Sequence, residues 1–346
     1  MATSSLPGEP VTSEPNIHPS TAPADAPATP TPETLAPEPA SDVASSTQSL
    51  SESIREHVYE NGRRYHKASW GKYAMPTDDT ELDRLDFTHA FYLELLDGKQ
   101  YLAPLDEDPA HVLDCGTGTG IWALDFGDEH PESKVVGVDL APIQPNWTAP
   151  NVCFELDDLE NRWTFDQNHF GFIHSRNIAA GIKNWPRYLT QMYRHATPGG
   201  WVEIVEHGLS TFYCDDGTMP ADSPFQIYMS AMSKSLENMG VNPHIELEDY
   251  RRMLEDAGFV NIQTHSFKTP IGTWPRNRKL RRLGAIISEL SNQGFEAYGR
   301  GVMTGFGGMG DEEAMRIIAE CVRMVKTGEQ HIYNQQWHLI AQKPRE

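Results

Sequence analysis

Residues 112–122, VLDCGTGTGIW, decide the fold, because a short apolar run leads there directly into a glycine-rich turn. The residues that follow have helical spacing, so the segment predicts a strand, a tight turn and a helix. In an open α/β sheet, ligands bind beyond the carboxyl ends of the strands, and a glycine turn there lets the backbone approach a ligand closely. A bare G-x-G pair is weak evidence for a cofactor, so the neighbouring strands decide the interpretation.

Acidic residues stand at the ends of the next two predicted strands. Asp139 follows Gly120 by nineteen residues, at a position suited to binding a ribose diol through two hydrogen bonds. Asp157 and Asp158 end the third strand, where a carboxylate can accept a hydrogen bond from the exocyclic amine of adenine. Three successive strand ends therefore predict an adenosine site.

The spacing of the glycines distinguishes a dinucleotide site from a site for another adenosine cofactor. The dinucleotide fingerprint is G-x-G-x-x-G, which seats a pyrophosphate on a helix N-terminus. Here the spacing is G-x-G-x-G, and Asp114 stands two residues before the first glycine. A carboxylate in that position would repel a pyrophosphate, whereas it suits the cationic amino acid end of S-adenosylmethionine, directly or through the loop backbone.

Short apolar runs alternate with helical stretches along most of the chain. This order predicts parallel strands joined by right-handed crossovers, with helices on both faces of a doubly wound α/β sheet. Strands are expected at 111–115, 134–140, 152–156, 170–174, 201–206, 260–269 and 332–342. Helices are expected at 51–66, 79–96, 122–129, 186–195, 224–239, 246–257, 276–298 and 311–327. The last strand alternates less cleanly than a buried strand would, so we expect it near the sheet edge.

Six short motifs carry a resemblance to a known family. They are YENGRRYH at 59–66, GKY at 71–73, DDTELDRLD at 78–86, LDCGTGTGIW at 113–122, PIQP at 142–145 and IHSRN at 173–177. In this order, over about residues 51–346, they resemble the LaeA-like fungal methyltransferases, which have the class I S-adenosylmethionine-dependent fold. The resemblance implies a mostly parallel sheet of seven strands, with an antiparallel seventh strand near the edge.

The resemblance also implies cofactor contacts. Carried onto this chain, they are Asp114, Gly116, Thr117, Gly118, Asp139, Leu140, Asp157, Asp158, Tyr73, Arg176 and Asn177. Cys115 departs from the aliphatic residue that is more usual at its position. We interpret it as a small buried hydrophobe rather than a catalytic thiol.

A methyl group on a sulfonium is already a strong electrophile, so few catalytic side chains are needed. A base should lie near the carboxyl ends of the fourth and fifth strands, where the options are His174, Glu203, Glu206 and His207. His207 is the catalytic candidate, because histidine titrates in the range suited to accepting a proton. A histidine that only lines the pocket, or bonds to backbone, is the alternative. Alternating side chains place Glu203 and Glu206 on opposite faces, so only one should reach the cleft.

Helical insertions at 223–240 and 277–327 are expected to roof the cleft. They contain seven of the 12 methionines: Met229, Met232, Met239, Met303, Met309, Met315 and Met324. Core packing explains most of them, and adaptable side chains would also suit a broad apolar substrate. The run GFGGMG at 305–310 is interpreted as a flexible joint, or a lid.

Residues 1–50 differ in composition from the rest of the chain. They hold 10 of the 25 prolines and six acidic residues, with no aromatic residue and no lysine or arginine. Such a segment buries too little apolar surface to offset chain entropy. We therefore predict a disordered acidic tail at 1–50 and a methyltransferase domain at 51–346.

Charge and cysteine content exclude several partners. The formal charge is -21, from 28 basic and 49 acidic residues, so nucleic acid is not an expected partner. The basic cluster at 276–282 is interpreted as a solvated helix start, with nuclear import as the alternative. No apolar run approaches the roughly 18 residues of a membrane span, and no signal peptide is recognisable. The four cysteines have no paired spacing that would hold zinc and no dense framework of disulfides, so we expect reduced, structural thiols. We expect a cytoplasmic protein, or a nuclear one if it is a regulator.

Three functions remain open on the sequence. The first is methylation of an oxygen, less favourably a nitrogen or sulfur, of a small molecule in fungal secondary metabolism. The second, which the resemblance implies, is a regulator of secondary metabolism acting with a velvet-type protein partner in the nucleus. The third is a methyltransferase fold used for a non-methylating reaction. The intact glycine loop and the acidic residues favour S-adenosylmethionine binding, which all three functions permit.

Overall fold

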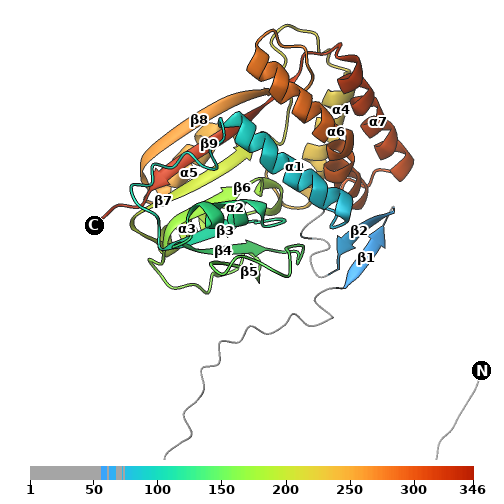
Figure 1. Cartoon of the computed structure of the whole chain (residues 1–346). Helices are drawn as coiled ribbons and strands as arrows, with labels where there is room; N and C mark the ends of the chain where they lie inside the picture. The colour runs from blue at the N-terminus through green and yellow to red at the C-terminus, as the bar shows by residue number, and fades with distance from the viewer. Residues whose placement is uncertain (1–55, 61, 68–71, 73–74) are drawn as a thin grey trace, which may run out of the picture. The chain divides into compact units, whose positions relative to one another are not determined.

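A seven-stranded sheet forms the centre of the protein, in the order β5-β4-β3-β6-β7-β9-β8 (Figure 1). Its strands are β3 (His111–Cys115), β4 (Lys134–Asp139), β5 (Val152–Leu156), β6 (Phe170–Arg176), β7 (Ala196–His207), β8 (Val260–Pro270) and β9 (Tyr333–Gln342). The pairs from β5 to β7 are parallel, and β9 pairs antiparallel with both β7 and β8. The predicted doubly wound, mostly parallel sheet is confirmed, as is the antiparallel strand next to its edge.

The structure is a computed structural model that describes residues 56–60, 62–67, 72 and 75–346. The predicted tail at 1–50, the first part of the helix expected at 51–66 and the predicted cofactor contact Tyr73 lie outside the described residues. No helix among the described residues is both long enough and apolar enough to span a membrane.

Helices cover both faces of the sheet, because successive apolar side chains along a strand point to opposite faces and both faces must be buried. Val112 packs with Phe126 of α2 (Ile121–Glu129) on one face. Its neighbour Leu113 points to the other face, where it packs with Leu189 of α3 (Trp185–His195). The helix α5 (Leu247–Asp256) lies on the α3 face, and α1 (Asp79–Leu95) packs beside α2. Two consecutive residues of one strand therefore belong to two cores.

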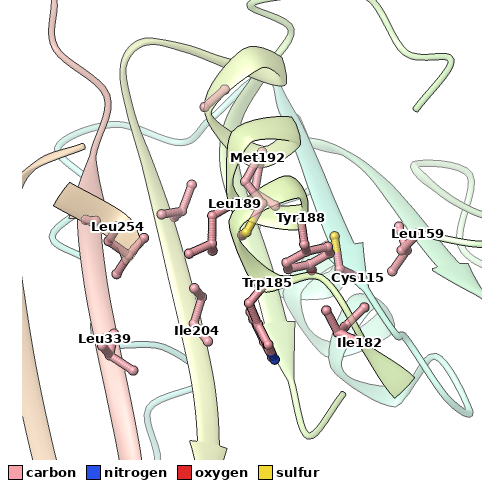
Figure 2. Packing of buried hydrophobic residues seen from close by; sticks show 14 of the residues in the cluster. Cys115, Leu159, Ile182, Trp185, Tyr188, Leu189, Met192, Ile204, Leu254 and Leu339 are labelled. Atoms are coloured by element: carbon pink, nitrogen blue, oxygen red, sulfur yellow. The ribbon is translucent and has the colours of Figure 1, made fainter. Parts of the chain in front are cut away.

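Cys115 belongs to the core on the α3 face. Figure 2 shows it beside Tyr188, with Trp185, Leu189 and Met192 on the same helix turned toward the strands. Its side chain is fully buried, and burial raises the pKa of its thiol well above the ordinary value. The interpretation of Cys115 as a buried small hydrophobe is confirmed.

The prediction of a helix at 51–66 is wrong for the described part of this stretch, which is a β-hairpin. β1 (His57–Glu60) pairs antiparallel with β2 (Arg63–His66), and Glu60 is opposite Arg63. Asn-Gly is the strongest short signal for a two-residue hairpin turn. Gly62 has φ 78°, which glycine adopts without strain. This turn chemistry outweighs the helical spacing.

Three helices form a separate layer with its own core, and Figure 1 shows them gathered at one end of the sheet. They are α4 (Pro224–Asn238), α6 (Arg278–Gly305) and α7 (Asp311–Thr327). The methionines of α4 are buried in this core together with Met303 and Met324, so packing explains them. Within 305–310 only Gly307 lies in a close contact, because a Cβ there would lie 2.3 Å from Ser235 Oγ, whereas a Cβ on Gly305, Gly308 or Gly310 would meet nothing within 4 Å.

The basic cluster at 276–282 lies at the start of α6, as predicted. Lys279 pairs with Asp97 at 2.7 Å and Arg282 pairs with Glu94 at 2.9 Å, both near the end of α1. These exposed pairs contribute little stability, but they place the start of α6 against α1.

Candidate active site

The glycine-rich turn after β3 requires its glycines. Gly116, Gly118 and Gly120 have φ of 71°, 59° and 83°, values that side chains with a Cβ rarely adopt. A Cβ on Gly116 would also lie 2.2 Å from Ile178 Cγ2. The turn is held by the N–H groups of Gly116 and Thr117, which both donate to the carbonyl of Val138 at the end of β4. The result is a bare backbone cradle at the strand ends.

Asp139 ends β4 beside this cradle. Its side chain is buried and accepts hydrogen bonds from Gly118 N at 2.8 Å and from Ala141 N at 3.0 Å. Burial raises the pKa of Asp139 to about 6, against the effect of these bonds. A carboxylate can accept about four hydrogen bonds, so Asp139 keeps acceptor capacity for the ribose.

A cavity of about 160 Å³ opens beyond these strand ends. Nine of the predicted cofactor contacts line it: Gly116, Thr117, Gly118, Asp139, Leu140, Asp157, Asp158, Arg176 and Asn177. They come from the ends of β5, β4, β3 and β6, which are consecutive in the sheet. The structure thus brings together residues that lie up to about sixty positions apart in the sequence.

Asp114 lies behind the glycine turn and does not line the cavity. It accepts from Thr117 Oγ1 at 2.6 Å, and its other oxygen lies 2.8 Å from His174 Nδ1. The His174 ring stacks on Trp122, with 3.8 Å between ring centroids. Asp114 thus supports the glycine turn rather than facing the cavity, and His174 is a buried support rather than a base in the cleft.

The expectation that one of Glu203 and Glu206 reaches the cleft is wrong, because both are buried under backbone N–H groups. Glu203 accepts from Leu102 N and Ala103 N at 2.8 and 2.9 Å. Glu206 accepts from Ile178 N at 2.8 Å, and burial raises its pKa to about 8. Neither glutamate lines the cofactor cavity or the apolar cavity next to it. Alternation correctly separates their faces, but backbone donors from distant segments hold both carboxylates in the core, where Glu206 Oε2 is buried without a hydrogen-bond partner among the described residues.

A second cavity of about 190 Å³ adjoins the first. The two share wall residues, among them Arg84, Asn177 and Tyr298. The second cavity is mainly apolar, with Phe212 after β7 and Phe295 on α6 among its walls. The predicted roof is confirmed for α4 and α6, which contribute to both cavities, whereas α7 lines neither cavity and packs in the core of the helical layer.

His207 is the one predicted base that lines a cavity. It ends β7, is half-buried, and its Nδ1 lies 3.1 Å from the carbonyl of Gly208. Asn334 Nδ2, which only donates, also lies 3.4 Å from Nδ1, but the shorter contact with a carbonyl that only accepts favours the tautomer with the proton on Nδ1 and a lone pair on Nε2. Asn334 Nδ2 donates to the same carbonyl at 3.3 Å. Burial lowers the pKa of His207, which favours the neutral form.

Arg84 and Tyr298 are site residues that pattern reasoning missed. Arg84 makes a buried bidentate pair with Glu81, at 3.0 and 2.7 Å, and its guanidinium lies 4.9 Å from the Tyr298 ring centroid. The pair belongs to the DDTELDRLD motif, and that signal could have been used. The contact with Tyr298 joins α1 to α6, and no local pattern indicates it.

Comparisons with known proteins identify the family of the chain. The methyltransferase domain family matches residues 87–264. Methyltransferase pytC of Aspergillus terreus is 38% identical over 289 residues, 83% of this chain and 88% of the relative. Secondary metabolism regulator LAE1 of Cochliobolus heterostrophus is 31% identical over 293 residues, 83% of this chain and 95% of the relative. Among solved structures, Haemonchus contortus phosphoethanolamine N-methyltransferase 2, in complex with S-adenosyl-L-methionine, has a TM-score of 0.43 and 18% identity, covering 80% of this chain and 56% of that one.

The residues present fit S-adenosylmethionine. A cradle that a Cβ on Gly116 would fill and carboxylates at the ends of two neighbouring strands match an adenosine and an amino acid end. Among the described residues, no group of three or more histidine, cysteine or acidic side chains is placed to hold a metal ion. The chain belongs to the methyltransferase domain family, and within it to the LaeA-like fungal S-adenosylmethionine-dependent enzymes of the class I fold.

Proposed function

We propose that this protein methylates an oxygen of a small apolar molecule in fungal secondary metabolism. The observation that carries the proposal is the second cavity, which adjoins the cofactor cavity and contains one histidine with a free Nε2 lone pair. Relatives named methyltransferase and secondary metabolism regulator, at 38% and 31% identity, support the biological setting.

The size and walls of this cavity support a compact aromatic acceptor. A cavity of about 150 Å³ lined by apolar side chains is known to hold one benzene ring, and this one measures about 190 Å³. Its walls include Phe91, Phe212, Tyr228 and Phe295, which favour contact with another ring. We infer that the part of the acceptor carrying the hydroxyl is about one substituted ring in size and uncharged.

In the proposed reaction, the residues of the chain position the acceptor and remove one proton from its hydroxyl. S-adenosylmethionine, held by the glycine turn, Asp139 and Asp157, would supply an electrophilic methyl group to the acceptor oxygen and would leave as a neutral thioether, so the proton of the acceptor hydroxyl is what the chain has to remove. His207 Nε2 takes the hydroxyl proton, and Gly208 O stabilises the resulting imidazolium through Nδ1–H. The roof helices exclude water from this step.

The alternative is a regulator that retains the cofactor site and acts with a velvet-type partner in the nucleus. Regulators such as laeA of Aspergillus fumigatus, 32% identical over 288 residues, favour it. We place the protein in the cytoplasm if it is a pathway enzyme, and in the nucleus if it is a regulator.

One labelling experiment separates the two functions. Purified protein is incubated with S-adenosylmethionine carrying a labelled methyl group, once with a small-molecule extract of the host and once with its nuclear proteins. Label in an extractable apolar compound supports the proposed function. Label in protein alone, or no label beyond that of a Gly116→Ala control, contradicts it.

A further inference from the structure

One short segment after β6 belongs to the walls of both cavities. Residues 177–182, the wall segment, line the cofactor cavity at every position except Ala179, and Asn177 and Ala180 also line the second cavity. The segment contains one 3-10 turn, η2 (Ala179–Gly181). Asn177 has φ 57°, a backbone conformation that persists only where its surroundings hold it. The contacts that fix this segment therefore shape both cavities.

Two successive residues of β7 hold the start of the wall segment. Val205 O accepts from Asn177 N at 2.9 Å, and Glu206 Oε1 accepts from Ile178 N at 2.8 Å. Ala179 N also donates to the Glu206 carboxyl group. The first N–H groups of a helical turn have no partner inside the turn, so those of Ile178 and Ala179 depend on Glu206.

The side chain of Ile178 connects this position to the glycine turn. Its Cγ2 occupies the space where Gly116 has no side chain, because a Cβ on Gly116 would lie 2.2 Å from it. The N–H of Gly116 in turn donates to Val138 O at 2.8 Å, at the end of β4. Glu206 is thus connected to the cofactor cradle through one residue of the wall segment, although it lines neither cavity itself.

The surroundings of Glu206 are unfavourable for a carboxyl group. Its side chain is 1% exposed, Trp337 of β9 faces it across the strand pair, and the rings of Tyr188 and Tyr250 lie near it. Among the described residues, its Oε2 has no hydrogen-bond partner and no cation pairs with the group. An unpartnered polar atom in a core is costly and calls for an explanation. The two backbone N–H groups that Glu206 holds supply that explanation.

Glu203 offers a direct comparison on the same strand. It is also buried and accepts from two consecutive backbone N–H groups, those of Leu102 and Ala103, at 2.8 and 2.9 Å. Leu102 and Ala103 line neither cavity. Removing the Glu203 carboxylate should therefore cost stability without moving a wall of the cofactor site.

We propose that Glu206 is a positioning residue for S-adenosylmethionine, which holds the wall segment in its binding position before the cofactor arrives. Without these two hydrogen bonds, the wall segment would have to be ordered when the cofactor binds, and this ordering weakens the affinity. The proposal rests on the cofactor assignment. It is independent of which acceptor is methylated and of whether the protein acts as an enzyme or as a regulator.

The test separates positioning of the wall segment from support of the fold. Calorimetry measures the Kd of S-adenosylhomocysteine for the wild type, Glu206→Leu, Glu206→Gln and Glu203→Leu, and thermal unfolding without ligand gives the Tm of each. Leucine is close to glutamate in size but accepts no hydrogen bond, whereas glutamine keeps one carbonyl oxygen for Ile178 N. Glu203→Leu is the matched control.

Glu206→Leu should bind S-adenosylhomocysteine at least about tenfold more weakly than the wild type, because two backbone donors lose their acceptor. Glu206→Gln should recover binding to within about threefold. Glu203→Leu should lower the Tm at least as much as Glu206→Leu and yet keep the Kd within about twofold of the wild type. Wild-type affinity in Glu206→Leu, or equal weakening by both leucine variants, would overturn the proposal.

Hydrogen exchange of the ligand-free wild type gives a second test, which requires no variant to fold. The N–H groups of Ile178 and Ala179 should have protection factors at least about tenfold above those of the exposed turn at 215–217. In Glu206→Leu this protection should be lost, while the N–H groups of β7 keep theirs. Protection that appears in the wild type only after S-adenosylhomocysteine is added would show that the ligand, and not Glu206, orders the segment, and would overturn the proposal.

Discussion

Asp139 Oδ2 accepts a hydrogen bond from the backbone N–H of Gly118 at 2.8 Å, which ties the end of β4 to the glycine turn after β3. The same carboxylate borders the cofactor cavity. One side chain therefore shapes the cradle and presents oxygen atoms to the ligand. Its protonation state should control both functions.

Cofactor affinity should fall below pH 6. Burial raises the pKa of Asp139 to about 6, so the carboxylate required for hydrogen bonding is present above that pH and is protonated below it. The affinity should decrease by up to about tenfold per pH unit below the pKa. Calorimetry with S-adenosylhomocysteine between pH 5 and 8 measures this. Asp139→Asn should bind more weakly and show no such dependence, and an equally steep pH dependence in this variant would contradict the assignment.

Gly116→Ala should abolish measurable cofactor binding. The backbone at Gly116 has φ 71°, and the new Cβ would lie 2.2 Å from Ile178 Cγ2, so the turn or the loop after β6 must move. Gly181→Ala is the matched control, because Gly181 lines the same cavity and a Cβ there meets nothing within 4 Å. Calorimetry should find the control near wild type. Equal effects of the two substitutions would show that the cradle does not depend on Gly116.

The strand–turn–helix at 112–122 and the acidic strand ends could be predicted because each signal is local. The hairpin at β1 and β2 was missed because helical spacing was given more weight than the turn chemistry of Asn61 and Gly62. The burial of Glu206 could not be predicted, because its donor is the backbone N–H of Ile178 on another segment. The contact between Arg84 and Tyr298 likewise depends on how α6 packs against α1.

Glu206→Gln should stabilise the protein more as the pH rises from about 5 to 8. Burial raises the pKa of Glu206 to about 8, above an unfolded value of about 4.3. The folded state then holds a proton that the unfolded state has released, so this group's contribution is lost as the pH approaches 8. Glutamine resembles the protonated form and can still accept from Ile178 N.

Urea unfolding of the wild type and of Glu206→Gln at several pH values measures this difference. The free energy of unfolding of the variant relative to the wild type should rise by at most about 1.4 kcal/mol per pH unit in that window. Ala or Leu at the same position would remove the acceptor for Ile178 N, so the measured difference in unfolding free energy would also include the loss of this hydrogen bond. A difference that does not vary with pH would show that Glu206 titrates at its ordinary value.

His207→Gln should reduce methyl transfer by about a hundredfold or more, while the Kd of S-adenosylhomocysteine stays within about twofold of the wild type. His207 lines the second cavity and not the cofactor cavity, so the substitution should leave the cofactor site intact. Because burial lowers the pKa of His207, the wild-type rate should rise with pH through a midpoint below the ordinary histidine value and then level off. The measurement is transfer of labelled methyl to the acceptor identified in the host extract, followed from pH 5 to 8.

Asn334→Ala should shift the midpoint of this pH profile without removing activity, since Asn334 donates to the Gly208 carbonyl that accepts from His207 Nδ1–H. Full activity of His207→Gln would show that this histidine only lines the cavity and that the acceptor loses its proton elsewhere.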